Sequence, residues 1–294
     1  MHIFPFSHEH TLTEQDFVHC CRDCERSYTL VSEGLRNFHA RINSYSREEL
    51  RRLSQQEIYQ LYLILDDIAH LECGHNLADR ILISRDIQDM LPDIRWYYTT
   101  FFEVHETCLV QEVLAADDPW QPLQVFGLYP RYETLIRTQM EQLALPRPKK
   151  LAFVGCGPLP LSLILLNRLY GIHSVGLDID PKAVILAGQC LERLGLDQGI
   201  SVIQGTEETL AELEWDVVVV AALAEPKQKI FSSLRRIMTC VGKRPVICRT
   251  YSGLKTLLHP PLREEDYTGF TVHHEIRPKT GRVNNTLVQL EMTE

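Results

Sequence analysis

A glycine-rich turn between a buried strand and a helix constrains the fold of this chain more than any other feature. Four apolar residues, Leu151–Val154, predict a strand that is covered on both faces. Gly155 and Gly157 interrupt this run, and glycine reaches positive φ at little cost and lets a ligand approach the backbone. A helix over Leu161–Tyr170 would follow, with Pro158 and Pro160 in its first turn. Strand, glycine turn and helix N-terminus together predict a nucleotide site in a doubly wound sheet.

The next segment supports this interpretation. Ser174–Pro181 predicts a second strand that ends in two carboxylates, Asp178 and Asp180, at roughly the 20-residue spacing where an acid binds a ribose. A helix over Lys182–Leu194 is expected next. No lysine-containing phosphate loop is present, so S-adenosylmethionine fits at least as well as NAD. The alternative is a parallel sheet whose glycine turn binds nothing.

The rest of this half repeats the pattern. Further strands are predicted at Ile200–Gln204, Trp215–Ala222 and Pro245–Arg249, a crossover helix at Pro226–Met238, and a closing antiparallel pair at Gly269–Ile276 and Asn284–Glu291, with alternation on the second of these two. We therefore expect an α/β, class I methyltransferase-like Rossmann fold, with its ligand beyond the carboxyl ends of the strands.

The N-terminal half predicts helices. Capping boxes stand at Thr11–Glu14, Ser46–Glu49 and Ser54–Glu57. The helix after the third box has a strong apolar face, and Asp66–Asp67 is expected on its solvated side. We predict an all-α bundle over residues 1–145 and a donor-binding domain over 146–294, separated by a polar, proline-rich linker.

One carboxylate lies on an apolar helix face. The helix from about Ile94 to Leu114 carries Phe102 and Leu109 on one side, and Glu106 lies four residues after the first and three before the second. A carboxylate there is costly unless it is paired or acts on a ligand. The alternative is a partly exposed residue at the border of the helix, and Glu103 lies one turn earlier.

Charge and cysteine content exclude several classes of function. A net charge of −9 argues against nucleic-acid binding, and no apolar run approaches the roughly 18 residues of a membrane span. No signal-peptide pattern opens the chain, and nine cysteines without regular spacing predict reduced thiols in a cytoplasmic protein. Cys20, Cys21 and Cys24, with Cys73 and His75, are interpreted as core residues rather than a metal cluster.

Two segments carry a family resemblance. Phe153–Leu161, with its GPLPL run, and Asp178–Pro181 closely resemble the signature of nicotianamine synthases and their bacterial opine-metallophore relatives. Phe126–Tyr132 resembles the family's FPYYxNY segment, Arg249–Gly253 its LRSAHG and Val283–Thr286 its VINS. The resemblance implies transfer of the aminobutanoyl (3-amino-3-carboxypropyl) group of S-adenosylmethionine, with release of methylthioadenosine and without a metal.

The resemblance also implies site residues. Glu106 falls where the family has a carboxylate of its EGxxE helix, and Glu106 and Tyr132 are the implied catalytic residues. The donor would be bound by Gly155, Cys156, Gly157, Pro158, Leu159, Asp178, Ile179, Asp180, Glu207, Ala222 and Leu223. The expected substrate-binding residues are Glu103, Tyr129, Arg131 and Arg249. The two arginines are expected to bind a carboxylate, because guanidinium binds carboxylate bidentately.

Several alternatives remain open at this stage. The implied acceptor is the amine of an amino acid, with histidine favoured, and repeated transfer to give nicotianamine is the alternative within the family. A small-molecule methyltransferase shares the fold, and twelve histidines with nine cysteines suggest a non-catalytic metal-binding protein. A homodimer is left open, while neither nucleic acid nor membrane is an expected partner.

Overall fold

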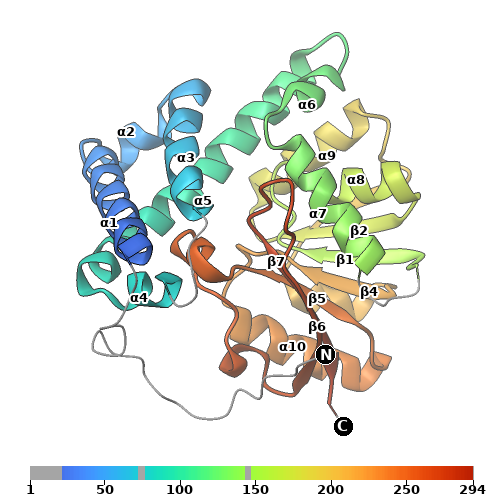
Figure 1. Ribbon diagram of the computed structural model, residues 1–294. Coiled ribbons are helices and arrows are strands. Elements are labelled where there is room, and N and C mark those ends of the chain that lie inside the picture. Colours follow the sequence, from blue (N-terminus) through green and yellow to red (C-terminus); the bar gives the residue numbers. More distant parts are fainter. Residues whose placement is uncertain (1–21, 72–76, 143–146, 294) are drawn as a thin grey trace.

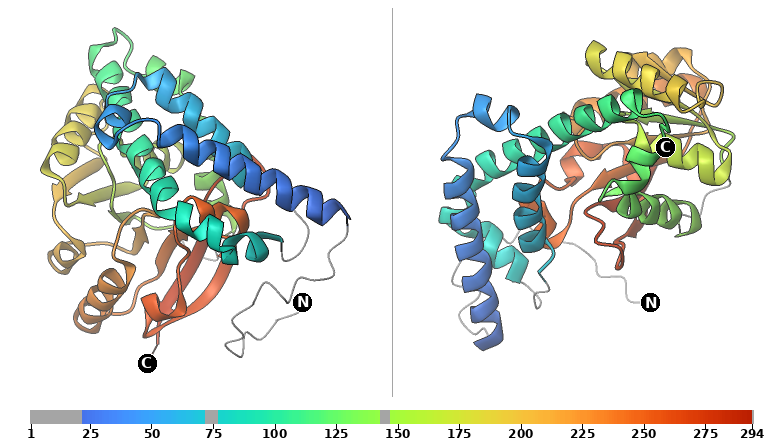
Figure 2. Two further views of the ribbon diagram at one scale, coloured as in Figure 1. Left: turned by 90° about the vertical axis from the view of Figure 1, so that its left-hand side faces the viewer. Right: turned by 90° about the horizontal axis from the view of Figure 1, so that it is seen from above.

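The computed structural model describes residues 22–71, 77–142 and 147–293 (Figure 1). A group of helices from the N-terminal half stands beside a twisted sheet that has helices on both of its faces. Figure 2 shows α5 running from the helical group across to the helices that cover the sheet. The predicted all-α half and α/β half are therefore both present.

The N-terminal helices begin where the sequence has caps. They are α1 (Arg22–Ile42), α2 (Arg47–Arg51), α3 (Gln55–Ala69), α4 (Leu77–Ile83) and α5 (Arg85–Ala115). Ser46 with Glu49 and Ser54 with Glu57 both form the predicted capping boxes. The box predicted at Thr11 lies outside the described residues. Helix α5 begins earlier than the predicted start near Ile94, so that Pro92 lies inside it.

The sheet has the order β3-β2-β1-β4-β5-β7-β6. Its strands are β1 (Lys150–Val154), β2 (His173–Asp178), β3 (Ile200–Gln204), β4 (Val217–Val220), β5 (Val246–Thr250), β6 (Phe270–Ile276) and β7 (Thr286–Met292). The first five strands are parallel, and β7 runs antiparallel to both β5 and β6. This is the predicted class I methyltransferase-like fold, and its chain order reverses between β1 and β4, where such sheets bind ligands.

Helices complete the two outer layers of the sheet. They are α6 (Gln121–Val125), α7 (Tyr129–Gln142), α8 (Leu161–Tyr170), α9 (Pro181–Arg193) and α10 (Lys227–Val241). Alternate residues of β1 divide between two hydrophobic clusters: Phe153 packs in the cluster that contains α8 and α9, and Ala152 in the cluster of α10. Helices α8 and α9 therefore cover one face of the sheet and α10 the other.

Two local predictions were wrong. Pro158 does not lie in the first turn of α8, because the helix begins only after Pro160, which is its N-cap. The second strand of the closing pair does not alternate between buried and exposed residues, since Thr286 to Leu290 are all buried. Strand β7 lies between β5 and β6 and is covered on both faces, since Leu287 packs in one hydrophobic cluster and Val288 and Leu290 pack in the other.

The two halves share a hydrophobic core. One cluster of buried side chains extends from α1 and α3 through α5 to β1 and α8, and α5 packs against α9. The predicted boundary near residue 146 stays a prediction. Within the described residues, no helix is both long enough and apolar enough to cross a membrane.

Candidate active site

A cavity of about 590 Å³ lies at the carboxyl ends of β1, β2, β4 and β5. Its volume is within the roughly 300–1,000 Å³ range of small-molecule sites. The β1–α8 turn and the residues that follow β2 and β4 form one side, and α5 and α7 contribute Glu106 and Tyr132 to the other. The cavity therefore combines both halves of the chain.

Gly155 opens the turn after β1 with φ of 81°. Its N–H donates to the carbonyl of Leu177 at 2.8 Å, which ties the turn to β2. A Cβ at position 155 would lie 2.9 Å from the Cβ of Ala224. Glycine is required here by the positive φ and by the close passage of the loop that leaves β4.

Gly157 joins three parts of the site. Its φ is 68°, and its N–H donates to Oδ2 of Asp178 at 2.8 Å. A Cβ at this position would lie 3.0 Å from Oε2 of Glu106 on α5. The absence of a side chain at position 157 therefore lets the carboxylate of Glu106 approach the turn.

The acidic end of β2 lines the cavity as predicted. Oδ1 of Asp178 accepts from the N–H of Asp180 at 3.0 Å, and Oδ1 of Asp180 caps α9 by accepting from Lys182 at 2.9 Å. Ile179 lines the same cavity and is 70% exposed. Both carboxylates keep lone pairs for further hydrogen bonds.

Cys156 is buried between the turn and β2. A Cβ on Gly176 would lie 2.9 Å from its Sγ, so the glycine in β2 makes room for the thiol. Burial raises the pKa of Cys156 to about 12. The thiol is therefore protonated at neutral pH and is a wall of the cavity rather than a nucleophile.

The predicted exits of β3 and β4 also line the cavity. Glu207 is buried and accepts a hydrogen bond from Oγ of Ser233 at 3.0 Å. The carbonyl of Ala222 accepts from Nζ of Lys227 at 3.0 Å, which fixes the loop that contains Leu223. Pro158 and Leu159 complete the set of predicted donor-binding residues around the cavity.

Glu106 is half-buried and faces the cavity. Burial raises its pKa to about 8, against a hydrogen bond from Tyr132 that lowers it, and the charge of Asp178 adds to the increase. The hydroxyl of Tyr132 donates to Oε1 of Glu106 at 3.3 Å. Among the described residues, no cation pairs with this carboxylate, so it has the properties of a proton acceptor that works near neutral pH.

Arg249 lies in the same cavity and is 4% exposed. Its Nη1 donates to Oγ of Ser162 at 2.7 Å and its Nη2 to Oε1 of Gln139 at 3.4 Å. Burial lowers its pKa to about 10. Arg249 therefore stays charged at neutral pH.

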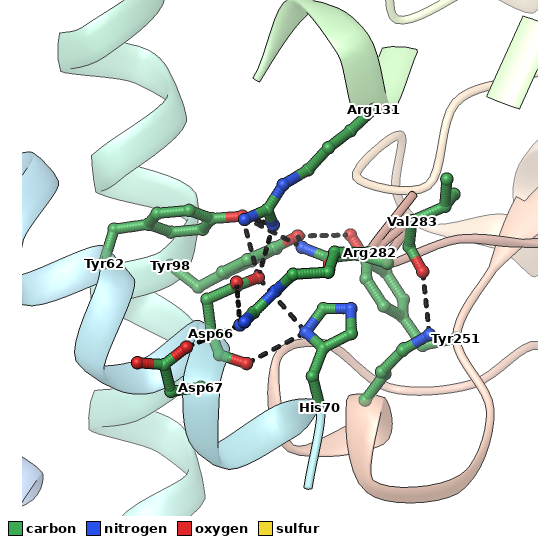
Figure 3. A network of polar contacts seen from close by, with 11 residues as sticks. Tyr62, Asp66, Asp67, His70, Tyr98, Arg131, Tyr251, Arg282 and Val283 are labelled. Atoms are coloured by element: carbon green, nitrogen blue, oxygen red, sulfur yellow. Dashed lines mark hydrogen bonds and ion pairs between the residues drawn. The ribbon is translucent and has the colours of Figure 1, made fainter. Parts of the chain in front are cut away.

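A second polar cluster surrounds Asp66 (Figure 3). Asp66 is fully buried, so its predicted place on the solvated side of α3 was wrong, whereas Asp67 is exposed. Arg131 donates to its Oδ1 at 2.7 Å and Arg282 to its Oδ2 at 2.7 Å. These arginines come from α7 and from the loop before β7. Segments distant in sequence therefore cover this face of α3 and bury Asp66.

Further hydrogen bonds complete the cluster. The hydroxyl of Tyr62 donates to Oδ1 of Asp66 at 3.1 Å, and Nδ1 of His70 lies 3.3 Å from the same oxygen. Burial raises the pKa of Asp66, but the hydrogen bonds from His70 and Arg131 outweigh it and hold that pKa well below its usual range. Asp66 is therefore ionised and fully paired.

Three predicted substrate-binding residues lie outside the centre of the cavity. Arg131 is paired with Asp66 and lines an adjacent pocket of about 40 Å³, which shares wall residues such as Tyr132 with the cavity. Tyr129 starts α7 and is not among the described residues that line either space. Glu103 lies at the rim, with its side chain 60% exposed and 3.6 Å from Arg51. Of the two candidate glutamates, Glu106 is the one that the fold brings to the glycine turn.

Sequence reasoning missed part of the wall. Tyr98, Tyr251, Asn285 and Ser162 also line the cavity. The spacing of Tyr98, Phe102 and Glu106, four residues apart on α5, is the one sequence signal that places Tyr98 on the ridge of Glu106. Tyr251 and Asn285 come from loops after β5 and before β7, and no periodicity marks them.

Cysteine and histidine do not gather into a metal site in the described part of the chain, where no group of three potential ligands is found. Cys20, Cys21, Cys73 and His75 lie outside the described residues. The described cysteines Cys108, Cys156, Cys190, Cys240 and Cys248 are free.

Comparison with known sequences identifies relatives. The model of the family described as "Nicotianamine synthase protein" matches residues 29–293. Nicotianamine synthase 2 of Arabidopsis thaliana is 30% identical over 185 residues, which are 58% of this chain and 57% of that protein. L-histidine 2-aminobutanoyltransferase of Pseudomonas aeruginosa is 28% identical over 142 residues, 47% of this chain and 52% of that protein. The chain thus matches little more than half the length of either relative.

Comparison with solved structures finds relatives consistent with this family match. A crystal structure of a glutamate-to-glutamine variant of MtNAS in complex with S-adenosylmethionine superposes with a TM-score of 0.81 at 30% identity, covering 94% of this chain and 100% of that one. A structure of MtNAS in complex with MTA and tNA gives the same TM-score at 31% identity.

Proposed function

The chain belongs to the nicotianamine synthase family, and from that premise we propose that it transfers the aminobutanoyl group of S-adenosylmethionine to the amine of an amino acid. One observation carries the proposal: the carboxylate of Glu106 approaches within 3.0 Å of the space that a Cβ of Gly157 would fill. A proton acceptor of the helical half therefore stands directly against the donor-binding turn of the sheet. A methyltransferase fold alone does not require such a group there.

The donor fits the wall of the cavity. Gly155 and Gly157 leave backbone open for the approach of a ligand, and Asp178 and Asp180 offer carboxylate oxygens to the ribose hydroxyls. Ile179, which is 70% exposed, provides apolar surface for the adenine. Bound here, S-adenosylmethionine supplies an electrophilic carbon next to its positively charged sulfur.

The transfer needs a neutral amine beside that carbon. The amine nitrogen attacks the carbon of the aminobutanoyl arm that is bonded to sulfur, so a C–N bond forms while the C–S bond breaks. The electron pair of the broken bond stays on sulfur, and methylthioadenosine leaves. Glu106 takes the proton that the amine loses, and a carboxylate whose pKa is raised to about 8 is a much stronger base than an ordinary one.

Tyr132 positions this base. Its hydroxyl donates to Oε1 of Glu106 at 3.3 Å and leaves Oε2, on the side of Gly157, for the amine. The site's main contribution is orientation, because it must present the arm and not the methyl group in line with the nucleophile.

For the acceptor we favour histidine. The resemblance to L-histidine 2-aminobutanoyltransferase of Pseudomonas aeruginosa supports this choice, while nicotianamine synthase 2 of Arabidopsis thaliana keeps repeated transfer as the alternative. We further propose the cytoplasm as the compartment, which the free thiols of the described cysteines support.

Product analysis tests the proposal. The protein is incubated with S-adenosylmethionine and a mixture of amino acids, and the released nucleoside is identified by mass spectrometry. We expect methylthioadenosine together with an acceptor heavier by one aminobutanoyl group. A sample without amino acids measures nucleoside released in the absence of an acceptor. S-adenosylhomocysteine with a methylated acceptor would make the protein a methyltransferase and would overturn the proposal.

A further inference from the structure

The cavity contains a buried cation that lacks a counter-ion. Arg249 is 4% exposed, and its hydrogen bonds in the described part of the chain go to two uncharged side chains, those of Ser162 and Gln139. An isolated buried charge is costly, and proteins keep one where a partner arrives. Asp66 shows that this fold does pair buried charges, since each of its two carboxylate oxygens accepts from an arginine.

The guanidinium keeps donors to spare. Arginine has five N–H groups, and the bonds from Nη1 to Ser162 and from Nη2 to Gln139 use two of them. Nε makes no hydrogen bond within the described residues, and neither does Nε2 of Gln139, which is 1% exposed. Arg249 lines the cavity and Gln139 does not, and neither of these two nitrogens has an acceptor in the described part of the chain.

The neighbours of Arg249 hold it rigidly. Its Cζ lies 5.1 Å from the centre of the Phe153 ring on β1, and Ser162 belongs to the first turn of α8. The positive end of the α8 dipole adds to the attraction for an anion. A planar, fixed guanidinium with open donors is suited to two-point binding of a carboxylate.

We propose that Arg249 binds the α-carboxylate of an amino-acid group, with Ser162 and Gln139 as the acceptors that fix its guanidinium. The inference rests on the proposed function, in which both the aminobutanoyl arm and the acceptor carry such a group. Glu106, Tyr132 and Arg249 line the same cavity, and the hydroxyl of Tyr132 donates to Glu106. The cavity thus offers a base for an amine and a cation for a carboxylate.

The donor arm of the test measures binding without turnover. Dissociation constants for S-adenosylmethionine and for decarboxylated S-adenosylmethionine, which lacks only the carboxylate, are determined by calorimetry. If the donor supplies the carboxylate, the wild-type protein prefers S-adenosylmethionine by about tenfold to hundredfold. Arg249→Met abolishes that preference by weakening only the complete donor. Arg277→Met, an exposed arginine paired with Glu275, is the matched control and leaves the preference unchanged.

The acceptor arm compares the amino acid that product analysis identifies with its methyl ester. If the acceptor supplies the carboxylate, the ester has a KM higher by about tenfold to hundredfold, and Arg249→Lys, which keeps the charge but not the fork, narrows the gap. Arg249→Lys also replaces Arg249→Met in the donor arm if the methionine variant does not fold.

The outcomes separate this inference from the proposed function. Discrimination that depends on Arg249 in either arm supports the inference and says which substrate supplies the carboxylate. Equal binding of both donors and equal KM values for both acceptors by the wild type overturn it. A protein that forms S-adenosylhomocysteine refutes the proposed function, while the donor arm still decides whether Arg249 binds the donor carboxylate.

Discussion

Asp66, which is fully buried, and Glu106, which is half-buried, are two carboxylates of the helical half with opposite surroundings. Asp66 on α3 accepts hydrogen bonds from Arg131, Arg282 and Tyr62. Glu106 on α5 receives one from Tyr132 and has no cationic partner among the described residues. The pKa of Asp66 is accordingly lowered, and that of Glu106 is raised to about 8.

The difference separates Asp66, an acid that stabilises the fold, from Glu106, an acid that faces a cavity. The Asp66 cluster links α3 to α7 and to the loop before β7, so its partners are supplied by the fold itself (Figure 3). Glu106 instead borders open space at the glycine turn. Glu106, which lacks a cationic partner among the described residues, is therefore the carboxylate that can exchange a proton with a ligand.

Replacing Glu106 should have the largest effect on activity. Glu106→Gln keeps the shape and the contact with Tyr132 but cannot accept a proton, so we expect turnover to fall by about 10²- to 10⁴-fold. Donor affinity should stay within about threefold, because Asp178 and Asp180, which we propose bind the ribose, are unchanged. Glu112→Gln, an exposed residue of the same helix, is the control. Steady-state kinetics and calorimetry check both numbers, and unchanged turnover would remove Glu106 from the mechanism.

Replacing Asp66 should have the largest effect on stability. Asp66→Asn removes the anion of Arg131 and leaves Arg282 with Asp67 alone, and breaking a buried pair costs about 3–5 kcal/mol in the free energy of unfolding. Asp67→Asn, at an exposed position that also pairs with Arg282, should cost less than about 1 kcal/mol. Urea unfolding of both variants gives the comparison. Equal losses would mean that the cluster acts through Arg282 alone.

The two acids should give opposite pH dependences of stability. The folded protein holds a proton on Glu106 up to about pH 8, whereas an unfolded glutamate loses it near 4.5, so this contribution is lost as pH rises between those values. The slope is at most about 1.4 kcal/mol per pH unit. Relative to wild type, Glu106→Gln should therefore gain stability from pH 5 to 9. The penalty of Asp66→Asn should shrink only as pH falls below 3.8, the ordinary value for that group.

A smaller effect is expected at the glycine turn. Gly157→Ala places a methyl group at φ 68° and 3.0 Å from Oε2 of Glu106. Gly195→Ala has the same backbone strain, at φ 69°, but open space around it. Both should lose about 1–2 kcal/mol of stability, and only Gly157→Ala should lower turnover. Equal turnover in the two variants would show that the approach of Glu106 to the turn does not matter for the reaction.

The sequence predicted the strands and turns of the sheet more easily than the burial of residues in the helical half. Leu151–Val154 with Gly155 and Gly157 marks strand and turn locally, because apolar runs and glycine have direct backbone meanings. The burial of Asp66 could not be predicted in the same way. Its partners Arg131 and Arg282 lie 65 and 216 residues away, and periodicity on one helix says nothing about what will cover it.

The site residues divide along the same line. The place of Glu106 on an apolar face of one helix is a local pattern that singled it out, and its catalytic role was implied by the family resemblance. Tyr251 and Asn285 line the cavity only because loops after β5 and before β7 turn toward it. Arg131 looked like a substrate clamp next to Tyr132, and the fold uses it to hold Asp66.

The contact between Gly157 and Glu106 has a consequence for how such a protein can be rearranged. The glycine turn and Glu106, the proposed base, belong to segments on opposite sides of residue 146, yet the missing side chain of Gly157 leaves the space that the carboxylate approaches. Fusing residues 147–293 to a different helical domain would keep the glycine turn but would lack Glu106, the proposed base. We expect the two segments to be inherited together, and a substitution at Gly157 or at Glu106 to require a compensating substitution at the other.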